Sequence, residues 1–555
     1  MFSRMLPALL AALILPAAAQ ASGPWYVSKS GNNANTCLDA AHACLTVSAA
    51  VTKAASGDTI NVGAGTFNEQ VTVPGTKTLT FNGAGSDAST GTIVDGHGAG
   101  TPFTLTNGGT LNNMRVTEDS AGTVLAGSTG SSHSLAITNA VIIADGYQSP
   151  LDAETSGGSL SVSITDSTLQ QVQTDAAGSE YGVLLQGQIS ASLVRSTVSS
   201  VRSAAVAAGT GVNVTATDST LTGETGLADT NGTLHVYRCR ITGTVDNGIQ
   251  TYTGSGAGGD LTALIEDSLV RGTTAAVYAH AASAGKSTTM TIHDSTVVTS
   301  GPGAVDGVFT DAFGGATSSI TLDGSAVQAR STDGGATRDL RADEAAATMN
   351  ASFSAFSTAV ATVGASVPGP GSGSNIAGDP KFTDPAGGDY SLQQSSPLVD
   401  KGDQADIVAG EKDLTGGVRA LDGDGNGIAT ADIGAVEHTY VPPAPGGGND
   451  GGGGSTTTPP PLDTSAPAFT NVKVRNGRLR FTLSEPAKVT VTITKRKGTH
   501  RKRARRFTIA GKAGANLAAF KKLKPGTYRI VLTAIDGSSN RSKQISRAFT
   551  VKRHT

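Results

Sequence analysis

The sequence predicts an all-β chain, built for most of its length as a parallel β-helix and completed by a small β-sandwich. Two observations carry this prediction. One strand motif returns every 20 to 29 residues, and a different set of short alternating strands follows a Pro/Gly-rich linker. The composition agrees, because Gly accounts for 72 of 555 residues and long helix-forming runs are absent.

The strand motif is clearest in the stretch SVSITDSTL. Val162 and Ile164 alternate with polar residues, as in a strand with one buried face, and Leu169 resumes the apolar pattern after a bend at Asp166 and Ser167. Five further copies place the residues equivalent to Ser167 at Ser196, Ser219, Cys239, Ser268 and Ser295. A repeat of this length is typical of stacked units, each of which buries its apolar side against its neighbours.

A fainter strand lies between the copies of the motif. Its occurrences align at 181–186, 204–209, 225–230, 247–252, 275–280 and 306–311. Two or three short strands per repeat, with no helix between them, fit one coil of a parallel β-helix, and neighbouring coils should lie about 4.8 Å apart. An array of β-sandwiches is the alternative, but it needs antiparallel hairpins and a period of about 100 residues, which the sequence does not show.

The N-terminus predicts export. Arg4 precedes an apolar stretch at 6–18, and an Ala-Gln-Ala cleavage site follows, so residues 1–21 form the expected signal peptide. No later apolar run reaches about 18 residues, so we expect no transmembrane anchor.

The first coil is predicted to be closed and covered. Export permits disulfides, and we expect Cys37 and Cys44 to pair in a polar loop. Cys239 is left over at a Ser position of the repeat, where we expect a small semi-buried residue, with a reactive thiol as the alternative. A short helix is expected at 46–56, with Thr46 as its cap. Such an element would cover the open edge and apolar end of the first coil.

Charge divides the chain into two parts. Residues 463–555 contain 23 Lys and Arg against 3 Asp and Glu. The whole chain contains 41 Lys and Arg and 44 Asp and Glu, so 18 basic and 41 acidic residues precede this segment. A Pro/Gly-rich linker at 441–462 separates the two parts. Opposite charge indicates that they have different functions.

Several segments resemble known families. The stretches YVSKSGNNANTC and HACLTVSAAVTKAASGDTINVGAGTFNE are similar to the start of secreted bacterial right-handed parallel β-helix proteins with the pectate-lyase-like fold. The stretches DPKFTDPAGGDYSLQQSSPLVDKGD and DLTGGVRALDGDGNGIATADIGAVE resemble the end module of choice-of-anchor Q domain proteins. The stretch KPGTYRIVLTAIDGSSNRS resembles the last hairpin of Ig-like modules on bacterial surface proteins.

These resemblances imply a domain order. The β-helix would occupy residues 22–375, a choice-of-anchor Q-like end module 376–440, and a basic Ig-like domain 463–555. They imply the fold and secretion but no definite reaction, because the β-helix superfamily includes lyases, hydrolases, esterases, epimerases and non-enzymatic adhesins.

The fainter strand carries the candidate ligand-binding residues. If its central apolar residues point inward, alternation places on the outer face of three consecutive coils Gln250, Tyr252, Tyr278, His280, Phe309 and Asp311. Aromatic residues are only 4% of the chain, so this gathering is informative. Aromatic rings stack on sugar rings, and His with Asp can transfer a proton, so the face predicts saccharide binding or catalysis. An aromatic ladder packed beneath a loop is the structural alternative.

Other signs of catalysis are sparse. Of the signatures of polygalacturonase-like β-helices, only a Gly-His-Gly tripeptide at 96–98 is present, in a Gly-rich turn. We expect backbone capping, with calcium bridging as the alternative, at the bend acids Asp166, Asp218, Asp267 and Asp294. The catalytic residues of any enzyme are therefore unknown from the sequence.

A cation site is predicted in the end module. Asp422, Asp424 and Asn426, followed by Gly, match the start of an EF-hand-type loop. The twelfth position is Ile instead of an acid, and Asp432 stands one residue earlier. Calcium is therefore the candidate cofactor, and a plain Asp/Gly turn is the alternative.

The C-terminal domain contains the run KRKGTHRKRARR at 495–506, with eight Lys or Arg, on a predicted hairpin loop. Because export argues against nucleic acid, we expect an anionic wall polymer as its partner, with an attraction that weakens in salt. A solubilising surface without a partner is the alternative.

Together these patterns predict a secreted or cell-surface protein that binds extracellular polysaccharide. A polysaccharide lyase or glycoside hydrolase of the pectate-lyase-like superfamily is the alternative, and a structural adhesin or stalk is the second alternative.

Overall fold

The computed structural model describes residues 23–441 and 466–551, apart from gaps at 99, 120, 147, 175–179, 255–258, 363, 406, 409, 476–477, 486, 498–499, 520–522, 536–541 and 544. The predicted signal peptide and nearly all of the predicted linker lie outside the described residues. The chain divides into two compact units, 1–444 and 445–555. In the described part of the chain, no helix is long and apolar enough to cross a membrane.

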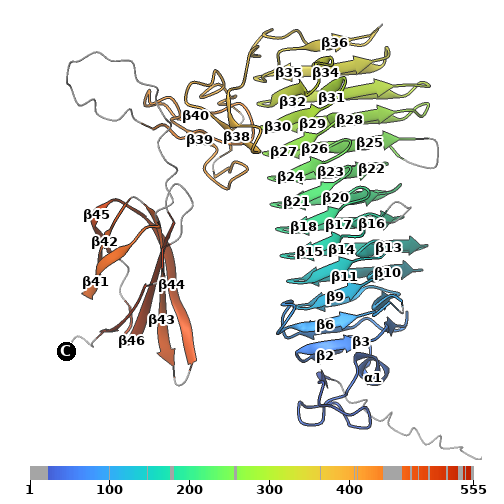
Figure 1. Cartoon of the computed structure of the whole chain (residues 1–555), viewed down its shortest axis with the longest axis vertical. Helices are drawn as coiled ribbons and strands as arrows, with labels where there is room; N and C mark the ends of the chain where they lie inside the picture. Colours follow the sequence, from blue (N-terminus) through green and yellow to red (C-terminus); the bar gives the residue numbers. More distant parts are fainter. Residues whose placement is uncertain are drawn as a thin grey trace, which may run out of the picture. The chain divides into compact units, whose positions relative to one another are not determined.

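The first unit is a parallel β-helix (Figure 1). Its coils stack because each short strand can pair its backbone, and bury its apolar residues, only against the coils on either side. Within the described residues the strands form three parallel sheets of 13, 11 and 12 strands, named here sheets A, B and C. The predicted parallel β-helix is therefore confirmed.

Sheet A contains β1 (Trp25–Val27), β2 (Thr59–Val62), β5 (Thr80–Gly83), β8 (Gly109–Asn112), β11 (Ser132–Thr138), β14 (Ser159–Thr165), β17 (Ile189–Val194), β20 (Val212–Thr217), β23 (Gly232–Tyr237), β26 (Leu261–Glu266), β29 (Ser287–His293), β32 (Thr317–Asp323) and β35 (Ala347–Ser352). Sheet B contains β3 (Gly65–Asn68), β6 (Thr92–Asp95), β9 (Arg115–Glu118), β12 (Val141–Ala144), β15 (Thr168–Gln171), β18 (Thr197–Ser200), β21 (Thr220–Gly223), β24 (Arg240–Gly243), β27 (Leu269–Gly272), β30 (Thr296–Gly301) and β33 (Ala326–Ser331). Sheet C contains β4 (Val71–Val73), β7 (Phe103–Leu105), β10 (Val124–Thr129), β13 (Leu151–Ser156), β16 (Val183–Gln186), β19 (Val206–Ala208), β22 (Leu227–Asp229), β25 (Ile249–Thr253), β28 (Ala275–Ala281), β31 (Val305–Ala312), β34 (Thr337–Asp343) and β36 (Ala359–Ala361).

The turn from sheet A to sheet B has a left-handed residue. Asp166, Asp218, Asp267 and Asp294 adopt φ values of 51°, 52°, 46° and 46°. Asp is among the few residue types that tolerate this conformation, which explains the bend that breaks the apolar alternation. In two coils an arginine takes this position, and Arg195 and Arg238 pair with the aspartates of the preceding coils, Asp166 and Asp218, at 2.7 Å.

The residue after each left-handed residue forms a buried ladder along the rod. The backbone N–H of Ser167 donates to Oγ of Ser196, and the N–H of Ser196 donates to Oγ of Ser219, at 3.2 and 3.1 Å. Cys239 continues this ladder, because its Sγ accepts the N–H of Ser219 at 3.4 Å. Burial raises the pKa of the Cys239 thiol to about 12, so it is a structural residue and not a reactive thiolate.

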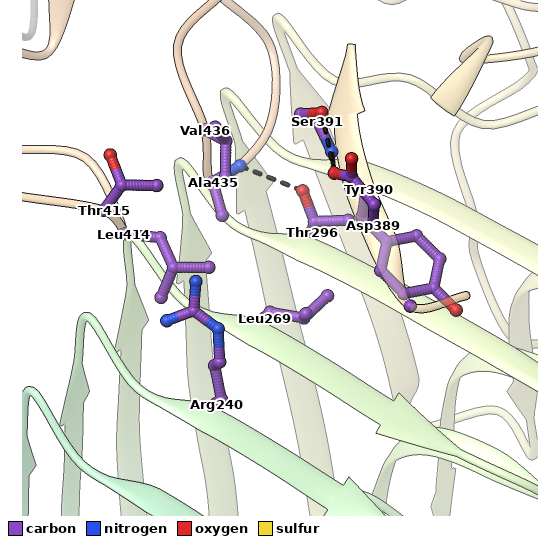
Figure 2. A pocket seen from close by; sticks show the side chains of 11 residues that line it. Arg240, Leu269, Thr296, Asp389, Tyr390, Ser391, Leu414, Thr415, Ala435 and Val436 are labelled. Carbon is purple, nitrogen blue, oxygen red and sulfur yellow. Dashed lines mark hydrogen bonds between the residues drawn. The ribbon is translucent and has the colours of Figure 1, made fainter. Parts of the chain in front are cut away.

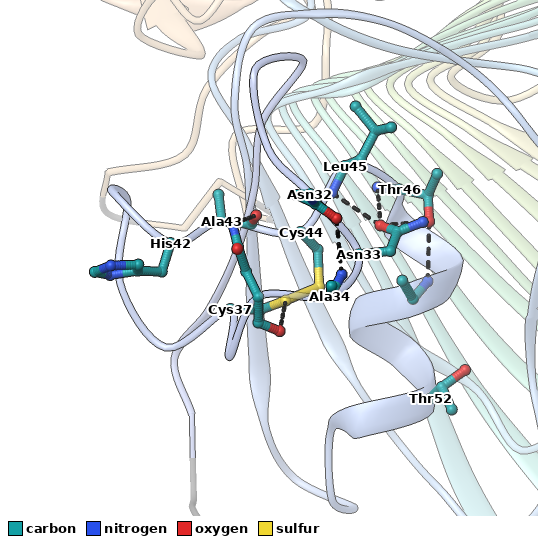
Figure 3. The surroundings of a disulfide bond; sticks show 12 residues. Asn32, Asn33, Ala34, Cys37, His42, Ala43, Cys44, Leu45, Thr46 and Thr52 are labelled. Atoms are coloured by element: carbon teal, nitrogen blue, oxygen red, sulfur yellow. Dashed lines mark hydrogen bonds between the residues drawn. A yellow bond between two sulfur atoms is a disulfide. The ribbon is translucent and has the colours of Figure 1, made fainter.

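A disulfide-closed loop and a helix cover the first coil (Figure 3). The disulfide joins Cys37 and Cys44. Helix α1 (Val47–Lys53) packs against β1, β2 and β4, and the side chain of its cap, Thr46, accepts the N–H of Ala49 at 3.2 Å. The helix ends earlier than the sequence suggests, because Ala54 is already extended. This element buries the apolar end of the rod.

The predicted end module lies within the first unit and packs on the side of the β-helix. It contains two short antiparallel pairs, β37 (Phe382–Asp384) with β38 (Asp389–Leu392) and β39 (Ala420–Leu421) with β40 (Thr430–Ala431). A cavity of about 120 Å³ lies between module and rod. The Ala435 N–H at this junction donates to Oγ1 of Thr296 at 2.9 Å (Figure 2). The predicted domain boundaries stay predictions.

The second unit is a small β-sandwich. One antiparallel sheet contains β41 (Phe469–Arg475), β42 (Arg478–Leu483) and β45 (Gly514–Ala519). The other contains β43 (Ala487–Lys497), β44 (His500–Gly511), β46 (Gly526–Ile535) and β47 (Ile545–Val551). A shared apolar core that includes Phe481, Val491 and Ile530 joins them. The Ig-like assignment remains a prediction.

Candidate functional site

The candidate site is on the outer face of sheet C, where β25, β28, β31 and β34 are adjacent and parallel. The inward residues Ile249, Val277 and Val308 are fully buried, as alternation requires, so the residues between them face outward. The register places Tyr252, His280 and Asp311 in one row across three coils. A second row contains Gln250, Tyr278 and Phe309. The structure therefore brings together all six residues of the predicted face.

The two rows use their rings differently. Tyr278 and Phe309 stack with centroids 4.8 Å apart, and the guanidinium of Arg341 lies 4.2 Å from the Phe309 centroid. The faces of these rings are therefore occupied by each other and by a cation. Tyr252 stacks on His280 at 5.0 Å, and Phe313 leans against His280 at 5.8 Å. Tyr252 and Phe313 are 41% and 42% exposed. We call Tyr252, His280 and Phe313 the aromatic bay.

The bay contains a hydrogen-bonded His–Asp pair. Nδ1 of His280 lies 2.6 Å from Oδ1 of Asp311, and the Tyr278 hydroxyl donates to Oδ2 of the same carboxylate at 3.0 Å. Asp311 is buried, and burial raises the pKa of its carboxyl although both hydrogen bonds act in the opposite direction. Burial and the nearby Asp311 charge also raise the pKa of Tyr278. An Nδ1–H that faces a carboxylate leaves Nε2 of His280 to accept a proton or a ligand hydrogen bond.

Charged residues of β31 and of the next strand, β34, border this pair. Arg341 contacts Asp306 at 3.3 Å and also pairs with Asp343, while Arg338 donates to Asp306 at 3.0 Å. The sequence prediction did not include these four residues or Phe313. The available signal was one more copy of the fainter strand, because Leu340 and Ala342 point inward and leave Arg341 and Asp343 outside.

The predicted cation ligands are only partly gathered. Ligand oxygens of Asp422 and Asp424 lie with one of Asp400 within 4.8 Å of one another. Asn426 instead uses its side-chain oxygen to accept the Ile428 N–H and its amide to donate to Asp424, each within 2.9 Å. The Asp432 carboxylate is buried and accepts the backbone N–H groups of Asp400 and His438.

This donor set fits calcium in part. Three carboxylates are suitable ligands for a hard cation that takes 6–8 oxygens, but with one oxygen each they supply at most half of that number. The sequence missed Asp400 because it stands 22 residues before Asp422 and outside the loop motif.

The bend acids of the last coils have an unexpected role. The fully buried Arg419 of the end module bonds to Asp294 at 2.8 and 3.0 Å and to Glu437 at 3.2 Å, and Asp267 lies 3.6 Å away. We call these four residues the arginine cluster. Asp267 and Asp294 therefore face the arginine of the module, in place of the expected backbone capping. Burial raises the pKa of Asp267 to about 8 and that of Glu437 to about 9.

The basic run differs in part from its prediction. Strands β43 and β44 extend through most of residues 495–506, and only 498–499 separate them, so the run is not confined to a loop. Its side chains from residue 496 onward lie outside the described residues.

One family model and two solved structures are similar to this chain. A family described as right-handed beta helix region matches residues 153–325. The crystal structure of pectate lyase Pel9A is similar at 13% identity and a TM-score of 0.32, over 75% of this chain and 96% of that chain. A tailspike protein, gp49 from Acinetobacter baumannii bacteriophage Fri1, a capsular polysaccharide depolymerase, is similar at 9% identity and a TM-score of 0.23, over 90% of this chain and 74% of that chain.

Among curated proteins, the search found no matching relative. The family match and the three parallel sheets together confirm the right-handed parallel β-helix. Secretion, the choice-of-anchor Q module and the Ig-like module remain predictions.

Proposed function

We propose that this protein is exported and binds an extracellular polysaccharide at the aromatic bay. One observation carries the proposal: Tyr252 and Phe313 are 41% and 42% exposed, and both contact the ring of His280. Large apolar rings are costly to expose, and rings fixed on rigid strands lose little entropy when a ligand packs on them.

The surroundings of the bay suit a sugar. A pyranose offers an apolar C–H face to an aromatic ring and hydroxyl groups to polar neighbours. Gln250 lies beside the bay, and Nε2 of His280 is oriented by the bond from Nδ1 to Asp311. Because neighbouring coils repeat the same outward direction, a polymer has a continuous surface along which to extend.

The binding proposal is tested with the full secreted chain and a panel of neutral, acidic and amino-sugar polysaccharides. Tyr252→Ala and Phe313→Ala should each weaken binding of the recognised glycan roughly tenfold, because each removes one stacking surface. Val201→Ala is the matched control, since Val201 is 47% exposed on the same rod and outside the bay. Binding that is equal in all three variants would show that the bay is not the site.

Glycan cleavage is the second candidate function, and the His280–Asp311 pair is the observation in its favour. A histidine whose Nδ1–H is held by a buried carboxylate can act as a general base through Nε2. A lyase or hydrolase would shorten the recognised glycan, which size-exclusion chromatography detects. His280→Ala should then abolish shortening, whereas shortening that persists would exclude this pair. A chain that neither binds nor shortens any glycan would favour the adhesin or stalk.

For the basic domain we propose attachment to an anionic wall polymer. The charge of residues 463–555, with 23 basic and 3 acidic residues, supports this assignment. Binding of the full chain to cell walls should fall steeply as salt rises from about 50 to 500 mM, because screening shortens the range of such attraction. Attachment that is insensitive to salt would contradict it.

Calcium binding by Asp400, Asp422 and Asp424 is a further proposal. Isothermal titration of the full chain with calcium should give heat that Asp422→Asn removes. Glu344→Gln, an exposed acid outside the cluster, is the control. Absence of heat at millimolar calcium would leave the segment as an Asp/Gly turn.

A further inference from the structure

A groove adjoins the aromatic bay on the same side of the rod. Its cavity of about 450 Å³ is lined by residues that include Tyr181, Glu224, Val245, Asp246 and Gln250. Gln250 connects the two features, because it lines the groove and stands two residues before Tyr252 on β25. A polymer bound at the bay that extends toward the N-terminal coils would therefore enter this groove.

Two carboxylates in the groove differ from the arginine-paired acids of the rod. Glu224 and Asp246 are half-buried and lie in adjacent coils, where the Asp246 N–H donates to the Glu224 carbonyl at 2.9 Å. Among the described residues, neither side chain has an ion-pair partner or a hydrogen-bond donor. By contrast, Asp166 and Asp218 are each paired with an arginine of the next coil. Arg202 does not line the groove, and its guanidinium donates to the Thr174 carbonyl at 3.2 Å.

The groove also offers apolar surface. Tyr181 contributes an aromatic ring, and Val245 is 61% exposed. This combination of an apolar wall with unpaired carboxylates matches the chemistry of an amino sugar, which has a C–H face and an ammonium group. A neutral sugar would use the apolar wall but leave the two carboxylates without a cation.

The net charge around the bay is negative, as it is in the groove. Asp306, Asp311 and Asp343 outnumber Arg338 and Arg341, and the chain before residue 463 contains 41 acidic and 18 basic residues. Such a field repels a polyuronate and attracts a polycation.

We propose that the groove makes the bay specific for a glycan with free amino groups, whose ammonium ions pair with Glu224 and Asp246. This inference rests on the proposed function, since the same glycan chain occupies the aromatic bay. It concerns which polymer is bound, and it is independent of whether the polymer is cleaved.

The test compares three soluble oligosaccharides of equal length with the full chain: a glucosamine oligomer, its N-acetylated form and an oligogalacturonate. The glucosamine oligomer should bind best. Glu224→Gln combined with Asp246→Asn should weaken its binding roughly tenfold and flatten the dependence on salt, because two charge pairs are lost. The same double variant should leave the weaker binding of the N-acetylated oligomer unchanged.

The control pair is Asp145→Asn with Glu344→Gln, since both acids are exposed and neither lines the groove. The basic domain repels the glucosamine oligomer, so its binding cannot come from that domain. Equal binding of the amino and N-acetylated forms, or an unchanged affinity in the groove variant, would overturn the inference while Tyr252→Ala still weakened binding. If no oligosaccharide responds to Tyr252→Ala, the proposed function fails instead.

Discussion

Two His–Asp pairs of the rod, which are buried to a similar degree, show how their neighbours decide the role of the same residue types. On β28 and β31, His280 and Asp311 are 2.6 Å apart at a surface bordered by exposed aromatic rings. On β29 and the turn after it, His293 and Asp294 are 3.7 Å apart, and both carboxylate oxygens of Asp294 already bond to Arg419. The first pair can meet a ligand, whereas the second belongs to the junction with the end module.

The two pairs differ because the end module packs on one part of the rod and not on the other. The turn from sheet A to sheet B is covered by the end module, whose apolar residues Tyr390, Leu414 and Ile433 share a core with Leu269 and Val298 of the rod. Because the end module excludes water from Asp267 and Asp294, their burial needs a compensating positive charge, and Arg419 of the module supplies it. Sheet C instead exposes the rings of Tyr252 and Phe313, which contact His280.

The largest expected change in stability comes from a substitution at the junction between the rod and the end module. Arg419→Met leaves the buried Asp294 carboxylate without its arginine and removes the charged neighbour of the Asp267 and Glu437 carboxyl groups, which should lower the free energy of unfolding by about 3–5 kcal/mol. Arg195→Met is the control, because its pair with Asp166 is exposed and such pairs contribute little to stability. Denaturant unfolding followed by circular dichroism gives both values. Similar losses in the two variants would mean that the cluster does not hold the module in place.

The second prediction concerns pH. Asp267 and Glu437 have pKa values raised from 3.8 to about 8 and from 4.5 to about 9, so between those limits the folded chain holds protons that the unfolded chain releases. Stability should therefore fall as pH rises through this window, by about 1.4 kcal/mol per pH unit for each proton retained.

Unfolding measured from pH 5 to pH 9 checks this slope. Glu437→Gln should flatten it, because the amide does not titrate. A flat profile over the same range would show that the carboxylates are already ionised in the folded chain.

The smallest expected change in stability concerns the other His–Asp pair, His280 and Asp311. Tyr278→Phe removes the hydroxyl that donates to Oδ2 of the buried Asp311 and should cost about 1–2 kcal/mol. Tyr252→Phe should cost almost nothing, since Tyr252 is exposed and stacks through its ring. Thermal unfolding of the two variants separates them, and an equal change would argue against a structural link from Tyr278 to Asp311.

The rod was predictable because its signals are local and repeated. Alternation around Val183 and its equivalents identifies the inner face of sheet C, and once that face is known the outward rows follow from the register. The left-handed turns are partly visible, since Asp favours them, but Arg195 and Arg238 occupy the same turns through ion pairs with the preceding coil.

The site was less predictable where partners are distant in sequence. Arg419 and Asp294 are 125 residues apart in the sequence, and no local sequence pattern predicts their contact. Asp400 joins Asp422 and Asp424 from outside the loop motif, whereas Asp432 turns inward to bind backbone N–H groups. Phe313 was missed because it follows the last aligned residue of the fainter strand, although it completes the bay.

The buried ladder and the arginine cluster together determine how the rod could change length. Removal of residues 197–219 would join Ser196 to Thr220 and recreate the Ser-Thr step of the neighbouring coil, so a whole coil could be lost with the ladder intact. The coils that contain Asp267 and Asp294 have no such freedom, because Arg419 requires both at once. The end module thus acts as a fixed reference from which coils are counted, and length variation is expected on the N-terminal side of it.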